Sequence, residues 1–90
     1  MKLTEKLPII NKLGLHLRAA AELVKLANKF KSHVTIVHGI QNVNAKSLMG
    51  LMTLAAAKGT DLEFTVEGDD AKDAMAAIKQ LLANKFGEKE

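Results

Sequence analysis

The stretch Asn11-Lys12-Leu13-Gly14-Leu15-His16-Leu17-Arg18-Ala19-Ala20-Ala21-Glu22 contains a histidine and an arginine where an extended segment is expected to turn into a helix. The first backbone N–H groups of a helix lack intrahelical partners, and the peptide dipoles add partial positive charge there, so a helix start can hold an anion. Arg18, the only arginine, adds a forked donor suited to phosphate oxygens. The stretch therefore predicts an anion site with His16 as a nucleophile beside it.

The segments on both sides of this stretch have clear periodic patterns. Residues 3–10 alternate and end in an apolar pair, which predicts a strand. Because proline cannot donate to a strand ladder, Pro8 predicts that this strand lies at a sheet edge or that its N–H side faces away from a neighbouring strand. Apolar residues at three- and four-residue steps predict a helix over residues 17–29 with one buried face.

Three strands and two helices follow along the chain, and the first of these helices falls within the apolar segment 45–55. Residues 32–37 and 42–44 flank a glycine-containing turn and predict a β-hairpin. Residues 61–67 alternate most regularly, with Phe64 on the inward face, and predict a strand. Periodic apolar residues over 71–85 predict a last helix.

The ends of the last helix are marked by acidic residues and a glycine. Asp69-Asp70 is predicted to cap its start, a commoner role for such a pair than catalysis, and Gly87 to stop it. Residues 88–90 are expected to form a loose tail. Residues 1–90 are predicted to form a single α+β domain of order β-α-β-β-α-β-α, with one antiparallel or mixed sheet covered by helices on one face.

An unusually apolar segment, residues 45–55, follows the hairpin. Ser47 is placed to cap a short helix from Leu48 onward. The segment is too apolar on all sides for an ordinary surface helix, so some of its side chains must enter the core. Those that stay outside would form an exposed patch of adaptable side chains, a use to which methionine is suited.

Composition limits the classes of function. The chain has no cysteine, so nothing indicates a disulfide scaffold, a thiol nucleophile or a thiolate metal site. His33 and His38 are interpreted as a strand residue and a turn residue, and we predict no metal and no cofactor. The uncharged runs are too short to span a bilayer and the start lacks a secretory signal, so a cytoplasmic protein is expected. We also predict a monomer.

Charge is distributed unevenly along the chain. Residues 1–58 hold nine basic side chains against Glu5 and Glu22, a net charge of +7, whereas residues 59–90 hold four lysines against eight acids, a net charge of −4. The basic half contains His16 and favours an acidic protein partner over nucleic acid. With only three aromatic residues, base stacking is hard to build, but a small RNA-binding domain of similar element order stays an alternative.

His16 can be interpreted in two ways. At a helix start its ring is expected to stay neutral, with one nitrogen free to attack a phosphoryl group that the backbone N–H groups and Arg18 then hold. Alternatively, His16 is only a polar cap and Arg18 a solvated charge, because short motifs often match by chance. The residues alone leave both interpretations open.

Two motifs resemble those of a known family. Residues 14–20, Gly-Leu-His-Leu-Arg-Ala-Ala, resemble the active-site signature Gly-Leu-His-Ala-Arg-Pro-Ala of HPr, the histidine-containing phosphocarrier of the bacterial phosphoenolpyruvate-dependent phosphotransferase system. Residues 44–52 resemble the family's second signature, around its regulatory serine. The resemblance covers essentially the whole chain and implies an open-faced β-sandwich, with a four-stranded antiparallel sheet and three helices on one face.

The resemblance implies a role for each matching residue. His16 would accept phosphate from phospho-enzyme I on Nδ1 and pass it to enzyme IIA domains, while Arg18 steadies the phosphoryl group, so the protein would be a carrier and not an enzyme. Ser47 matches the serine that an HPr kinase/phosphorylase modifies in some bacteria. The predicted partner-docking residues are Leu17, Leu48, Met49 and Met52.

Two residues depart from the family's signature. Ala19 stands in place of proline, which predicts a less rigid helix start with intact chemistry, because alanine is a strong helix former. Leu17 replaces a small residue, and its bulk could change which partner domains dock. Leu17 therefore leaves open a paralogue in nitrogen-related phosphotransfer. A regulatory HPr-like protein that signals through Ser47 without carrying phosphate is a separate alternative, and the presence of His16 counts against it.

Overall fold

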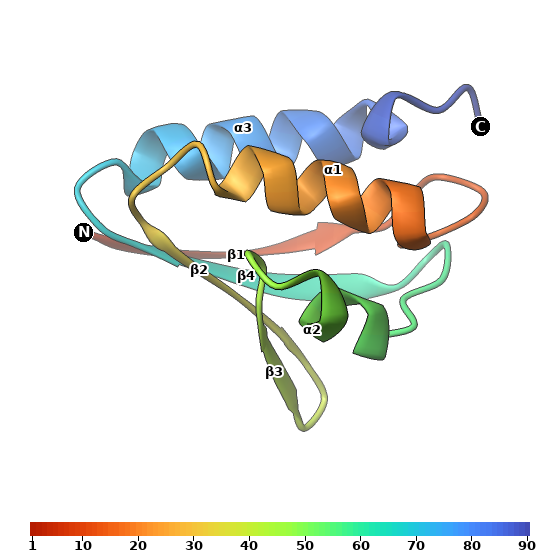
Figure 1. The fold of residues 1–90 in the computed structure, drawn as a ribbon, viewed down its shortest axis with the longest axis horizontal. Helices are drawn as coiled ribbons and strands as arrows, with labels where there is room; N and C mark the ends of the chain where they lie inside the picture. Colours follow the sequence, from red (N-terminus) through yellow and green to blue (C-terminus); the bar gives the residue numbers. More distant parts are fainter.

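One sheet of four strands forms the base of the computed structural model, which describes residues 1–90 (Figure 1). The strands are β1 (Lys2–Pro8), β2 (His33–His38), β3 (Gln41–Asn44) and β4 (Asp61–Glu67). Their spatial order is β1-β4-β2-β3, and every pairing is antiparallel. The edge position predicted from Pro8 is confirmed, because β1 has β4 as its only neighbour.

Three α-helices lie on one face of this sheet, and the other face is left open (Figure 1). They are α1 (Leu17–Ala27), α2 (Leu48–Thr53) and α3 (Ala71–Ala83), and a short 3₁₀ turn, η1 (Lys85–Gly87), follows α3. The predicted α+β order is confirmed, and of the two sheet types left open the antiparallel one is correct. None of the helices has the length and apolar character needed to cross a membrane.

The core lies between the sheet and the helices, and β4 supplies its centre. Phe64 is fully buried and lies opposite Ile36 of β2, while Val66 lies opposite Val34. Burying an aliphatic or aromatic side chain of this size contributes roughly 1.5–3 kcal/mol. Because Phe64 points into this core, it does not provide the exposed stacking surface that an RNA-binding domain of this order would need.

The apolar segment around α2 divides between core and surface. Leu51 and Leu54 are buried, whereas Met49 is 79% exposed. Leu48 and Met52, at 37% and 38% exposed, also remain at the surface. The serine cap is confirmed, because Ser47 Oγ accepts a hydrogen bond of 3.1 Å from the backbone N–H of Gly50.

The prediction that the Asp69-Asp70 pair caps the last helix is wrong. Asp70 occupies the N-cap position of α3, but its side chain makes no capping bond there. Instead, its carboxylate accepts hydrogen bonds from the backbone N–H groups of Lys31 (2.8 Å) and Ser32 (2.9 Å) and from the Ser32 hydroxyl. These bonds, led by that of the hydroxyl, lower the pKa of Asp70. Asp70 therefore ties the α3 start to the turn before β2.

Asp70→Ala is expected to destabilise the fold more than Asp69→Ala, because only Asp70 satisfies the buried Ser32. The pKa of Asp70 in the folded state lies below its ordinary value of 3.8. The Asp70 carboxylate therefore contributes to the free energy of unfolding above that pH, and this contribution is lost as the pH falls through the folded pKa. Urea unfolding at about pH 7 and about pH 3 measures the free energies of unfolding of both variants and the parent. Equal urea midpoints for the two variants at neutral pH would contradict the assignment.

Candidate functional site

The loop between β1 and α1 presents His16 at the start of α1. Leu15 N–H donates to the Ala56 carbonyl at 2.8 Å, which fixes the loop on the segment that follows α2. His16 is the N-cap residue, with extended backbone angles (φ −77°, ψ 178°), and its carbonyl accepts the bond from Ala20 N–H. Its side chain is 28% exposed. The predicted position of His16 at a helix start is therefore confirmed.

Gly14 allows the loop before α1 to lie directly against the backbone of Ala56 and Ala57. Its φ is +68°, in the left-handed region that favours glycine. A Cβ atom at this position would lie 2.5 Å from the Ala56 carbonyl oxygen and 2.9 Å from Ala57 Cα, both of which are backbone atoms. The glycine of the motif thus has a steric role two residues before the histidine.

The prediction that residues 88–90 form a loose tail is wrong. Lys85, Phe86 and Gly87 all have positive φ values, so the chain turns sharply after α3. Phe86 is buried at this turn and anchors it. The main-chain oxygen of Glu90 then accepts a hydrogen bond of 2.6 Å from Lys12 N–H, in the loop that precedes His16. The end of the chain consequently lies against the predicted anion site.

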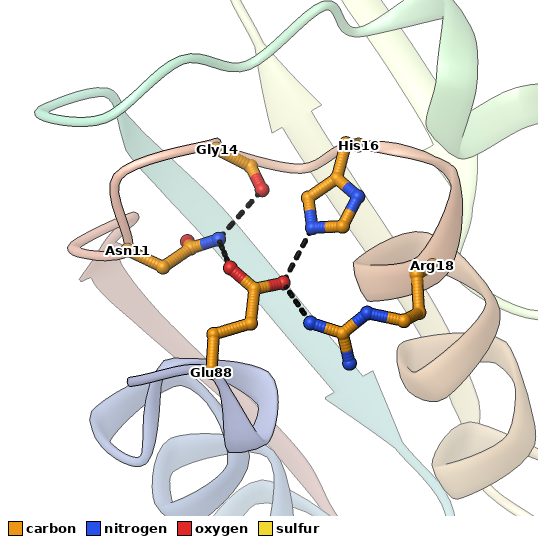
Figure 2. Close-up of polar contacts among 5 residues, drawn as sticks. All are labelled: Asn11, Gly14, His16, Arg18 and Glu88. Carbon is orange, nitrogen blue, oxygen red and sulfur yellow. Dashed lines mark hydrogen bonds and ion pairs between the residues drawn. The ribbon is translucent and has the colours of Figure 1, made fainter. Parts of the chain in front are cut away.

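Glu88 occupies the centre of that site (Figure 2). Its Oε2 atom contacts His16 Nε2 and lies 2.7 Å from a terminal nitrogen of Arg18. Its Oε1 atom accepts a hydrogen bond of 2.8 Å from Asn11 Nδ2, which also donates to the Gly14 carbonyl. His16 and Arg18 therefore meet on one carboxylate oxygen, and the anion between them belongs to the protein itself.

The surroundings of Glu88 favour its charged form. Burial of this carboxyl, which is 9% exposed, acts to raise its pKa. Hydrogen bonds from Asn11 and His16, together with the charges of His16 and Arg18, outweigh burial and lower the pKa below its ordinary 4.5. Glu88 is thus ionised at neutral pH and brings one of the acids of the acidic half of the chain into the basic half.

Asn11 and Glu88 are the two residues of the site that the sequence analysis missed. Asn11 looked like an ordinary loop residue, although it is fully buried. Glu88 follows the short turn at Phe86-Gly87, and a large aromatic residue just after a helix was the available signal. Such a residue is usually buried, so the residues after it are held near the core.

The other predicted residues lie on α1, α2 and β2. Leu17 is 59% exposed on α1, which packs against α2 and its exposed Leu48, Met49 and Met52 (Figure 1). Ser47 is the N-cap residue of α2 and makes no hydrogen bond to His16 or Arg18. His33 and His38 are the first and last residues of β2. The structure contains no group of three or more potential metal-ligating side chains.

Comparisons with known proteins find similar sequences and a similar fold. The family model described as "PTS HPr component phosphorylation site" matches residues 3–84. Phosphocarrier protein HPr of Neisseria meningitidis is 48% identical over 88 residues, which cover 98% of this chain and 99% of that protein. Phosphocarrier protein NPr of Shewanella violacea is 41% identical over 87 residues, covering 97% and 96%. The crystal structure of HPr-C-His from Thermoanaerobacter tengcongensis is similar with a TM-score of 0.93 and 40% identity, covering 98% and 99%.

Gly14→Ala is expected to destabilise the protein by about 1–3 kcal/mol and to displace the loop that carries His16, because of backbone strain and overlap with Ala56. Gly39→Ala is the matched control, since Gly39 also has a positive φ of +62° but open space around it. Urea unfolding measures the stabilities, and amide chemical shifts report the displacement. If the two variants lose equal stability, the contact with Ala56 has no role.

Proposed function

This chain belongs to the HPr family of phosphocarrier proteins of the phosphotransferase system, and we propose that it carries a phosphoryl group on His16. It accepts the group from phospho-enzyme I and passes it to an enzyme IIA domain. The observation that carries this proposal is the meeting of His16 and Arg18 on one anionic oxygen at the start of α1. A guanidinium that binds a carboxylate beside the histidine in this way is also suited to phosphate oxygens.

The proposed chemistry is nucleophilic transfer between proteins. A lone pair of the His16 imidazole forms a nitrogen–phosphorus bond while the bond between phosphorus and the donor breaks. The Arg18 side chain is 56% exposed, so it can follow the phosphoryl oxygens, and the N–H groups of the first turn of α1 add to their binding. The protein is a covalent carrier in this scheme, and catalysis belongs to its partners. The cytoplasmic location and monomeric state expected from the sequence stay predictions.

The partner-docking surface of this proposal is an apolar patch beside the site, formed by Leu17, Leu48, Met49 and Met52. All four side chains are exposed on α1 and α2, which pack against each other. Methionine adapts its shape to different partners, which suits a carrier that must bind a donor and an acceptor in turn. The basic character of residues 1–58 favours acidic partner surfaces and rapid encounter.

Regulation through Ser47 is a second part of the proposal. Ser47 lies at the start of α2, next to Leu48 and Met49 of the docking patch. A phosphate on this residue would be tolerated by the helix N-terminus but would place negative charge where an acidic partner docks. An HPr kinase/phosphorylase is the expected modifying enzyme where the host has one.

Two kinds of enzyme IIA domain, sugar-specific and nitrogen-related, are candidate acceptors of the phosphoryl group. The similarity to an NPr as well as to an HPr favours keeping a nitrogen-related acceptor beside a sugar-specific one. The His16 chemistry is the same in both branches, and the exposed Leu17 next to His16 is the residue expected to influence the choice. Offering the phosphorylated parent protein, and a Leu17→Ala variant in parallel, to enzyme IIA domains of both kinds separates the branches by transfer rate.

Incubation with phosphoenolpyruvate and enzyme I is expected to add one acid-labile phosphoryl group, because a phosphoramidate on His16 hydrolyses in acid. Intact-mass measurement and acid treatment detect it. His16→Ala should lose the label completely, while His33→Ala, His38→Ala and Ser47→Ala keep it. Labelling of His16→Ala at the parent level would exclude the proposed mechanism.

Ser47→Asp is expected to slow phosphorylation by enzyme I on the order of tenfold, because its charge opposes an acidic partner at the docking patch. Ser47→Asn is the matched control, since asparagine caps a helix as well as aspartate but is neutral. Initial rates for both variants, with circular dichroism to check folding, make the comparison. Equal rates for Ser47→Asp and Ser47→Asn would remove the regulatory role.

A further inference from the structure

The contact between Glu88 and His16 determines where the imidazole proton lies. An ionised carboxylate has only acceptor atoms, so it can pair with His16 Nε2 only when this nitrogen carries the hydrogen. The same Oε2 atom also forms an ion pair with Arg18, and this positive charge favours the unprotonated carboxylate. His16 Nε2–H is therefore the donor in this pair.

The other ring nitrogen, Nδ1, lies on the far side of the imidazole from Glu88 (Figure 2). The ring makes no capping hydrogen bond with the N–H groups of the first turn of α1, so the backbone does not occupy this nitrogen. A neutral imidazole carries one proton. When Nε2 holds it, Nδ1 has the free lone pair that a nucleophile needs.

We propose that Glu88 is a positioning residue, which keeps the proton of His16 on Nε2 and so directs phosphoryl transfer to Nδ1. This inference rests on the proposed carrier function, and it adds a residue from the C-terminal tail to that site. Its logic is that of a carboxylate behind a reactive histidine, where the carboxylate fixes the tautomer and orientation of the ring without taking up a proton.

The transfer step balances with Glu88 in this role. The Nδ1 lone pair forms the new bond to phosphorus, and the electron pair of the broken bond leaves with the donor, a phosphorylated protein. The imidazole gains positive charge, and Glu88 faces that charge through Nε2–H. Arg18 can turn from Oε2 to the phosphoryl oxygens, while Asn11 still holds Oε1 at 2.8 Å.

Glu88 is fixed well enough to act in this way. Its side chain is 9% exposed, and Asn11, which binds it, is itself fixed by a second bond to the Gly14 carbonyl. Glu90 offers a matched comparison on the same tail. Its carboxylate is 74% exposed and pairs only with Lys12, at 3.6 Å.

The test is the tautomer of His16 in the unphosphorylated protein, read from the ¹⁵N chemical shifts of the ring at about pH 8.5, well above the ordinary histidine pKa of about 6.5. The parent and Glu90→Ala should show the Nε2–H form in clear excess. Glu88→Ala should reduce the ratio of the two tautomers about threefold or more. Glu88→Gln should also reduce this ratio while residues 88–90 stay in place, because an amide can donate to a ring nitrogen as well as accept from it.

Phosphorylation by enzyme I gives the second measurement. The rate for Glu88→Ala and Glu88→Gln should fall about tenfold relative to Glu90→Ala, and Glu88→Asp should recover part of it. An unchanged tautomer ratio in both Glu88 variants would overturn the inference, even with normal labelling of His16. A parent protein that is never labelled would overturn the proposed carrier function instead, since the tautomer is measured without any phosphoryl donor.

Discussion

The Glu88 carboxylate joins the segment that follows α3 to the loop that precedes α1. It contacts a histidine that lies 72 residues earlier in the sequence, and it also binds Arg18 and Asn11. The architecture brings these residues together from two directions. β1, at the sheet edge, leads into the loop that holds Asn11. α3 covers the sheet and ends at the same end of the molecule, where η1 turns Glu88 toward that loop. The site is thus completed only when the last residues of the chain have folded.

Unfavourable local features are concentrated around this site. The three non-glycine residues with positive φ are Ala55, Lys85 and Phe86, and they belong to the two segments that border the His16 loop. Asn11 adds another cost, because its buried Oδ1 atom has no hydrogen-bond partner while Nδ2 serves two acceptors. Such features typically cost about 1–3 kcal/mol each. The sheet and its well-packed Phe64 supply the stability that permits them.

Local patterns in the sequence were sufficient for some parts of the structure and not for others. The strand at 61–67, the helix start at His16 and the Ser47 cap depend on residues close together in the chain, and all three were predicted. Asp70 was misassigned because its position fits a cap, whereas its actual partner Ser32 lies 38 residues away and is set by the tertiary fold. Glu88 was missed for the same reason, because no local pattern indicates which charged side chain of a tail will return to a distant loop.

The two chain ends lie at opposite ends of the molecule, with Met1 far from the start of α1 and the C-terminus beside it (Figure 1). Any residues joined after Glu90, such as a purification tag or a fluorescent fusion, would therefore begin next to Lys12 and the reactive histidine. They would compete with partner proteins for that surface and could separate Glu88 from His16, Arg18 and Asn11. Residues joined before Met1 would leave that surface free, so immobilisation or labelling through the N-terminus is the arrangement that preserves the carrier for binding studies.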